Sequence, residues 1–184
     1  MRVIKTALPG VLIVEPEVFG DSRGFFLETF QQERYAAAGI PGGELTFIQD
    51  NHSRSSKGVL RGLHFQLKNP QGKLVSAGTG TIFDVAADVN PDSKTFGQWV
   101  GVELSAENHH QLWIPPGYAH GFCVLSDSAD LHYKCTAPYN PADEGGIVWN
   151  DPDLDILWPV TMPLLSAKDA ALPTLAAAPR ELLP

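Results

Sequence analysis

The feature that most constrains this chain is a run of short strand-like segments between residues 44 and 136. They lie at 44–49, 59–66, 73–77, 81–88, 97–104, 111–114, 121–125 and 129–136. Turn residues such as Asn90-Pro91-Asp92 and Pro115-Pro116-Gly117 separate several of them. Strands of this length and spacing favour a jelly roll or a related barrel over an open sheet. The sequence therefore predicts an all-β fold.

A few shorter elements are predicted before this run. Residues 11–14 and 25–27 are expected to be strands, and the Asp-Ser-Arg-Gly sequence at 21–24 has the residues of a turn. A helix is expected to begin at Thr29, with a glutamine three residues later as in a capping box, and to end at Gly39. Peripheral helices of this kind do not change the all-β prediction.

The length and composition favour a single domain over residues 1–184. A chain of 184 residues with 43% hydrophobic content can bury one good core. Short helical pieces are expected near 151–157 and 166–170. Residues from about 170 to 184 are rich in Ala, Leu and Pro, and this tail is expected to pack on the surface or to fray.

The charge and the termini exclude several classes of function. A net charge of −8 argues against bulk binding to nucleic acid or to an anionic membrane, which would need a basic face. The first ten residues lack the apolar core of a signal peptide, and no apolar run reaches membrane-spanning length. Cys123 and Cys135 show no CxxC spacing and are expected to be buried thiols in a reducing compartment. These observations predict a cytoplasmic protein.

His64 is the first candidate for chemistry, because it lies in the otherwise apolar strand 59–66. A lone strand histidine is more often structural than catalytic, and from position alone the structural interpretation is favoured. Strand alternation puts His64 and Gln66 on one face and Arg61 on the other. A bulge or kink at Gly62 would bring Arg61 to the same face; without one, Arg61 serves elsewhere.

Tyr133, His120 and Asp169 are three further candidates with two interpretations each. Tyr133 is either a core tyrosine or a general acid facing a barrel lumen. His120 follows a Pro-x-Gly turn and either bonds backbone or points into the same cavity. In the sequence Ser166-Ala167-Lys168-Asp169 the serine can cap a helix, or the aspartate can orient a catalytic imidazole. From the residues alone the cap is favoured.

Several longer motifs resemble the dTDP-4-dehydrorhamnose 3,5-epimerase family. The match runs in order from about residue 3 to residue 170. Its motifs include Gly20-Asp21-Ser22-Arg23-Gly24-Phe25-Phe26, Leu60-Arg61-Gly62-Leu63-His64-Phe65-Gln66, Gln71-Gly72-Lys73-Leu74-Val75, Pro116-Gly117-Tyr118-Ala119-His120 and Ser166-Ala167-Lys168-Asp169. The resemblance implies a cupin-type jelly-roll barrel with a few short helices. In metal-binding cupins the first motif carries His-x-His, and Gln66 replaces the second histidine here.

The resemblance also implies the reaction. Family members invert C3 and C5 of dTDP-4-dehydro-6-deoxy-D-glucose and give dTDP-4-dehydro-L-rhamnose, in dTDP-L-rhamnose biosynthesis. The C4 ketone acidifies both neighbouring carbons, so a base on one face and an acid on the other suffice, through an enolate. No metal or organic cofactor is then required.

Carried over by position, the resemblance assigns roles to named residues. His64 is the implied proton acceptor, paired with Asp169; Tyr133 is the implied proton donor; and Lys73 stabilises the enolate oxygen. The implied binding residues for the nucleotide sugar are Arg23, Phe26, Glu28, Gln49, Asn51, Arg61, His120, Glu144 and Lys168. The family exchanges N-terminal strands within a homodimer, so Arg23 and Glu28 are expected to serve the partner's site.

Two alternatives stay open at this point. One is a related enzyme that inverts a single centre or moves the ketone of a dTDP-4-keto sugar. The other is a non-catalytic or metal-dependent cupin, which Gln66 disfavours. Ser76, Asn90 and His132 depart from the family pattern, and the sequence gives no account of their effect.

Overall fold

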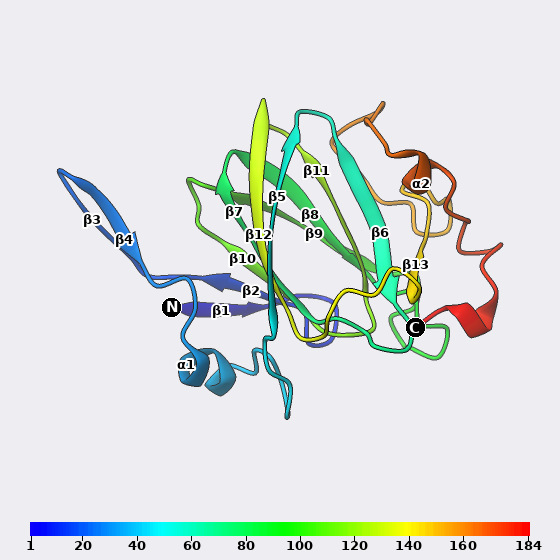
Figure 1. The fold of residues 1–184 in the computed structure, drawn as a ribbon, viewed down its shortest axis with the longest axis horizontal. Helices are drawn as coiled ribbons and strands as arrows, with labels where there is room; N and C mark the ends of the chain where they lie inside the picture. The colour runs from blue at the N-terminus through cyan, green and yellow to red at the C-terminus, as the bar shows by residue number, and fades with distance from the viewer.

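Two antiparallel sheets face each other and form the body of the molecule (Figure 1). The computed structural model describes all residues 1–184. The six-stranded sheet has the order β1 (Arg2–Lys5), β2 (Leu12–Glu15), β10 (Gln111–Ile114), β7 (Lys73–Thr79), β12 (Ser128–Cys135) and β5 (Gln49–Ser56). The five-stranded sheet has the order β13 (Glu144–Gly146), β6 (Leu60–Gln66), β11 (Ala119–Val124), β8 (Thr81–Ala87) and β9 (Trp99–Ser105). This is the predicted all-β barrel.

Helices are short and peripheral, as predicted. They are α1 (Gln32–Ala37), α2 (Ala167–Ala170) and a 3-10 turn at Arg180–Leu182. None of the helices has the length and apolar composition needed to cross a membrane.

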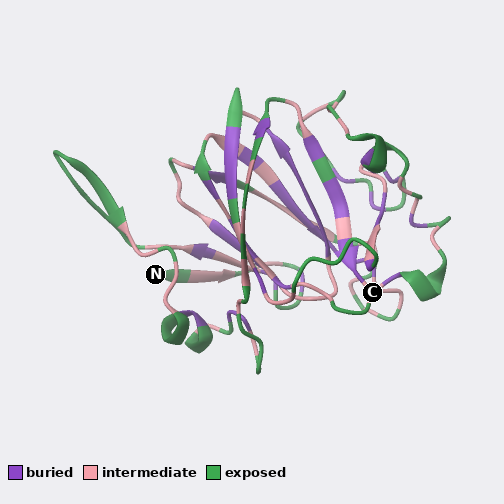
Figure 2. Cartoon of the chain, in the orientation of Figure 1, coloured by how far each residue is buried: buried purple, intermediate pink, exposed green.

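The largest apolar cluster lies between the two sheets. Val75 and Leu131 of the six-stranded sheet pack there with Ile82 and Phe122 of the five-stranded sheet. A second cluster covers the outer face of the five-stranded sheet, where Leu175 and other residues of the C-terminal segment pack. The tail predicted to pack or fray therefore packs, because its leucines complete this cluster. Figure 2 shows the buried positions running along the strands of both sheets.

The β3–β4 hairpin, Val18–Asp21 and Gly24–Leu27, stands apart from both sheets (Figure 1). The predicted turn joins its strands, and the Arg23 amide donates to Asp21 Oδ1 over 2.8 Å. The hairpin is exposed along its length (Figure 2), and the exposed fractions of Phe19, Phe25 and Phe26 are 57%, 61% and 68%. Contiguous exposed aromatic side chains of this kind mark an interaction surface.

Three sequence predictions of local structure are wrong. The strand expected at 44–49 is β5 at Gln49–Ser56, whose residues are polar on both faces and so give no hydrophobic alternation. Helix α1 begins at Gln32 and not at Thr29, because the Gln31 side chain caps it by accepting from the Arg34 amide. Residues 151–157 form a turn and not a helix, since the Asp151 carboxylate accepts from nearby backbone amides and holds that turn.

Candidate active site

A polar cavity of about 230 Å³ opens between the two sheets, beside the apolar cluster. His64, Lys73 and Tyr133, three of the four predicted catalytic residues, line it, and they come from β6, β7 and β12. The other lining residues are Gln49, Asn51, Phe65, Gln66, Gln71, Tyr139 and Glu144. The fourth predicted catalytic residue, Asp169, lies behind His64. The fold thus gathers residues that are far apart in the sequence.

A bulge in β6 solves the problem of strand alternation around Gly62. His120 of β11 pairs with His64, but Phe122 pairs with Arg61, so three steps along β6 match two along β11. Gly62 has a φ of +109°, and a Cβ there would lie 2.6 Å from the His120 carbonyl oxygen. Arg61 does not line the cavity: its guanidinium donates to Ser55 Oγ over 2.9 Å, and from there its charge opposes the rise in the pKa of Tyr133. The predicted kink at Gly62 is therefore confirmed.

His64 and Asp169 form a hydrogen-bonded pair. His64 Nε2 lies 2.6 Å from Asp169 Oδ1, and the Asp169 side chain is almost fully buried. A carboxylate only accepts hydrogen bonds, so Nε2 carries the proton and the Nδ1 lone pair of a neutral imidazole is free. Burial lowers the pKa of His64, while the charge of Asp169 opposes that effect. The result is an imidazole of fixed orientation with its other nitrogen available as a base.

Ser166 caps a helix and Asp169 also contacts the His64 imidazole, so the cap and the contact to the ring occur together. Ser166 Oγ caps α2 by accepting from the Asp169 amide over 3.0 Å, and it donates to Asp169 Oδ2 over 2.8 Å. The helix start therefore fixes the carboxylate that faces His64.

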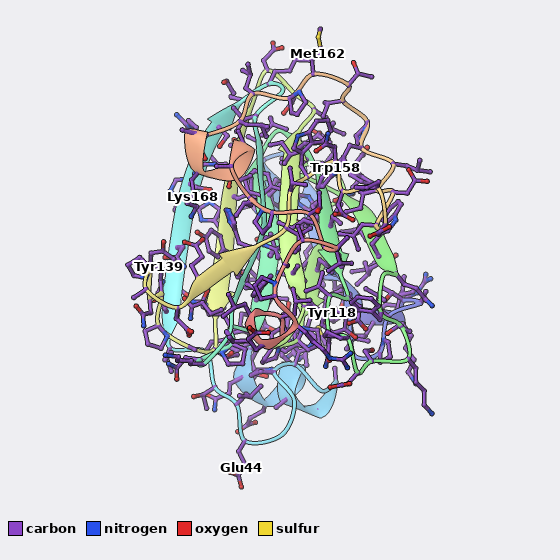
Figure 3. All side chains as sticks on the ribbon, turned by 90° about the vertical axis from the view of Figure 1, so that its right-hand side faces the viewer. Glu44, Tyr118, Tyr139, Trp158, Met162 and Lys168 are labelled. Atoms are coloured by element: carbon purple, nitrogen blue, oxygen red, sulfur yellow. The ribbon has the colours of Figure 1, made fainter.

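Glu144 links His64 to the rim of the cavity. Its Oε1 lies 3.6 Å from His64 Nδ1, and its Oε2 accepts from Lys168 Nζ over 2.7 Å and from the Tyr139 hydroxyl over 2.8 Å. Tyr139 and Lys168 appear on the same side of the molecule in Figure 3. Tyr139 was not predicted from the sequence, and no signal points to it until β13 brings Glu144 beside His64.

Lys73 has a free ammonium group at the cavity wall. Burial lowers the pKa of this lysine; the Cys135 thiolate, when it forms, and the charges of Asp84 and Glu144 counteract the shift, without any hydrogen bond to the ammonium. A half-buried, unpaired cation at a cavity wall can bind an anionic oxygen of a ligand.

Tyr133 is a half-buried phenol on the lumen face of β12. It packs against the apolar cluster between the sheets, and burial is the largest cause that raises its pKa. A raised pKa keeps the hydroxyl protonated at neutral pH, as a proton donor requires.

A second histidine–aspartate pair lies next to the first. His120 Nε2 is 2.8 Å from Asp84 Oδ1, and both residues are buried. His120 is the cross-strand partner of His64, although it does not line the cavity itself. Asp84 was not predicted; an aspartate inside the apolar strand Thr81–Ala87 is the signal that could have found it.

The structure does not bring the predicted N-terminal binding residues to this cavity. Arg23 lies on the exposed hairpin with its guanidinium on Asp21, Phe26 is exposed, and Glu28 is paired with Arg34 over 2.7 Å. None of the three lines the cavity. Within one chain the site therefore holds only part of the predicted set.

Gln66, at the position of a metal-ligating histidine in other cupins, anchors backbone instead. Its amide nitrogen donates to the carbonyl oxygens of Asn69 and Pro138, and its carbonyl accepts from the Asn140 amide over 2.8 Å. These bonds hold the segment that carries Tyr139 against the cavity.

Comparison with known proteins supports a single family. The model of the dTDP-4-dehydrorhamnose 3,5-epimerase family matches residues 5–177. The dTDP-4-dehydrorhamnose 3,5-epimerase of Salmonella typhimurium is 58% identical over 177 residues, which are 95% of this chain and 96% of that protein. Both matches extend over nearly the whole chain.

Solved structures agree in fold. The crystal structure of dTDP-6-deoxy-D-glucose-3,5-epimerase from Legionella pneumophila, in complex with dTDP-4-keto-L-rhamnose, matches with a TM-score of 0.94 and 53% identity, and covers 100% of this chain and 97% of that one. A 3′-monoepimerase from Streptomyces bikiniensis, in complex with dTDP-quinovose, matches with a TM-score of 0.86 and 36% identity, over 93% and 86% of the two chains.

Proposed function

The chain belongs to the dTDP-4-dehydrorhamnose 3,5-epimerase family, and from this membership we propose how its cavity performs the reaction. The activity is an isomerisation that inverts C3 and C5 of dTDP-4-dehydro-6-deoxy-D-glucose. The observation that carries the residue assignment is that His64, Lys73 and Tyr133 line one cavity. We propose that this cavity holds the keto-hexose.

Proton removal falls to His64. Asp169 fixes the Nε2 proton, so Nδ1 takes the hydrogen from the carbon next to the ketone. The imidazolium formed is stabilised by the buried Asp169 carboxylate and by Glu144, 3.6 Å from Nδ1. A carboxylate on each side of the ring suits a base that must hold a proton briefly.

Two other side chains stabilise the enolate and return the proton. Lys73, whose ammonium has no partner in the chain, stabilises the oxygen that becomes negative at C4. Tyr133, kept neutral by burial, returns a proton to the opposite face of the carbon. The same set acts at C3 and then at C5, since both carbons flank the same ketone. No step requires a cofactor.

The binding of the nucleotide is proposed to need a second subunit. Gln49, Asn51, Arg61, Glu144 and Lys168 lie at or near the cavity of their own chain, and His120 lies behind it. Arg23, Phe26 and Glu28 lie on or beside the exposed hairpin, and none of them lines that cavity. We propose a homodimer in which each hairpin reaches the partner's site, where Arg23 binds phosphate oxygens bidentately.

Deuterium incorporation tests the chemistry. With dTDP-4-keto-6-deoxyglucose in heavy water, the wild-type protein should incorporate deuterium at C3 and at C5. His64→Ala should lower both exchange rates by at least about 10²-fold and leave dTDP binding nearly unchanged. Near-normal exchange in this variant would refute the role of His64.

The same experiment separates a second candidate function. The match to a 3′-monoepimerase favours a single-centre enzyme as the alternative. Deuterium at one carbon only, with a product inverted only there, would replace the double epimerase by this alternative.

A mixing experiment tests the exchanged hairpin. Arg23→Ala and His64→Ala, each inactive by itself, should regain about a quarter of the wild-type rate after unfolding and refolding together. With equal amounts of the two variants, half of the dimers contain one subunit of each. Each of these mixed dimers has one complete site, in which His64 of one subunit meets Arg23 of the other. Arg23→Ala refolded with the double variant Arg23→Ala/His64→Ala is the control, and it should regain nothing. No recovery in the first mixture, with dimers present, would show that the hairpin serves its own chain.

A further inference from the structure

The buried carboxylate of Asp84 has one oxygen without a hydrogen-bond partner. Oδ1 lies 2.8 Å from His120 Nε2, whereas Oδ2 is the one buried side-chain oxygen or nitrogen of the chain that has no partner. The exposed fraction of Asp84 is 0%. Such a group is costly unless a nearby positive charge compensates it, so its surroundings point to what it does.

The strand register aims Asp84 into the space between the sheets. On β8, Asp84 shares a face with Ile82 and Ala86, and both of these pack in the cluster between the sheets. The cation on the facing sheet is Lys73, whose ammonium has no hydrogen bond and no ion pair. On β7, Lys73 shares a face with Val75 and Ala77, which pack in the same cluster, so both residues project into the space between the sheets. Asp84 is an anion with one oxygen that has no hydrogen-bond partner, and Lys73 is a cation without an ion pair.

From this arrangement we infer that Asp84 is a positioning residue of the reaction, whose fixed negative charge keeps the Lys73 ammonium charged and directed at the substrate. Its first oxygen is held by His120, so the carboxylate cannot rotate away. Its second oxygen makes no competing bond, and its charge acts across the cavity wall. This inference rests on the proposed function, in which Lys73 stabilises the enolate.

The other titratable groups around Lys73 do not replace this charge. Cys135 on β12 and Glu144 on β13 also act on the lysine, while His64 and His120 belong to the facing sheet. Glu144 already accepts from Lys168 and Tyr139. Burial raises the pKa of the Cys135 thiol, which keeps it neutral near pH 7. Asp84 is thus the buried carboxylate near Lys73 that has one oxygen without a hydrogen-bond partner.

Asp84→Asn tests the inference, since it keeps the shape and removes the charge. We expect kcat to fall by about 10- to 100-fold with little change in KM or in dTDP binding. The alkaline limb of the pH profile of kcat should move to lower pH, because Lys73 then loses its proton more easily. Asp84→Glu, which restores the charge, should restore the limb. A purely structural role would lower the melting temperature and leave the limb in place, and that result would overturn the inference.

Asp88→Asn is the matched control. Asp88 is also buried, but its carboxylate accepts from Ser93 and Thr95 in the loop after β8, away from the cavity. The Asp88→Asn variant should have a lower free energy of unfolding and an unchanged alkaline limb in the pH profile of kcat. If Asp88→Asn moves the limb as far as Asp84→Asn, the assignment is wrong.

A measurement on the wild-type protein covers the case in which Asp84→Asn does not fold. Lysine labelled with ¹³C at Cε, assigned with Lys73→Arg, should show Lys73 charged through neutral pH. Loss of its proton below neutral pH would overturn the inference. Absence of deuterium exchange in the wild type would instead refute the proposed function, so the two failures are distinguishable.

Discussion

The histidines of two histidine–aspartate pairs are cross-strand neighbours on β6 and β11, and the two pairs differ in how their carboxylates are bonded. In the His64–Asp169 pair, both carboxylate oxygens have partners, His64 at one and Ser166 at the other. In the His120–Asp84 pair, one oxygen has none. The histidine side chains differ as well, with exposed fractions of 22% for His64 and 10% for His120.

The difference in bonding suits the two histidine–aspartate pairs to two different roles. A fully bonded carboxylate has a fixed direction, so Asp169 orients an imidazole whose other nitrogen meets the cavity. A carboxylate with a free oxygen, shielded from water, acts over a longer range through its charge. The first pair is thereby suited to move a proton, and the second to set the charge of its surroundings.

The largest fall in kcat is expected for the Asp169→Asn variant. The amide can donate to His64 Nε2 and so stabilise the wrong tautomer, with the proton on Nδ1 where the base is needed. Loss of kcat by about 10²- to 10⁴-fold is expected, as for the orienting aspartate of a catalytic triad. Steady-state kinetics check this, with dTDP affinity as the control that the site is intact. A loss of less than about tenfold would place Asp169 in a capping role alone.

An intermediate effect is expected from Glu144→Gln. The Glu144 charge favours the imidazolium and so raises the pKa of His64 against the effect of burial. Without that charge the imidazole stays neutral to lower pH, and the acid limb of kcat should move to lower pH. The pH profile measures this shift. Tyr139→Phe removes a hydrogen bond to Glu144 without changing its charge, so it should leave the limb in place. A shift to higher pH in Glu144→Gln would contradict the electrostatic argument.

The strands from β6 to β12 could be predicted from the sequence, because their apolar alternation and turn residues are local signals. The three-residue strand β13 was not predicted. Strand β11 begins at Ala119 instead of residue 121, but β10 agrees at both ends. Strand β5 could not be placed in this way, since side chains of both its faces are polar. Its position follows from pairing with β12, which is a tertiary contact.

The candidate site also has parts that local sequence signals could predict and parts that depend on tertiary contacts. The bulge at Gly62 followed from strand alternation, and a phenol facing the lumen was one of two interpretations of Tyr133, whereas the role of Lys73 came from the family resemblance alone. The pairing of His64 with Asp169 joins residues 105 apart in the sequence, so only the family resemblance could suggest it. Asp84 carried a signal that was not used, an aspartate inside an apolar strand, whereas Tyr139 gave none, because a loop tyrosine acquires meaning only from its neighbours in space.

The smallest effect is expected from Ser166→Ala, which tests whether the bonding of the Asp169 oxygens matters at all. The change removes the cap of α2 and the bond to Asp169 Oδ2, at a cost of about 1 kcal/mol in the free energy of unfolding. It also leaves Asp169 with one free oxygen, as in Asp84, and freer to turn. We therefore expect a fall in kcat of only a few-fold, together with the lower stability, measured by denaturant unfolding and steady-state kinetics. Ser166→Thr keeps the hydroxyl and should preserve both quantities. Full activity in a clearly destabilised Ser166→Ala would mean that the hydrogen bond to His64 alone fixes the carboxylate, and that the contrast between the two pairs lies in burial.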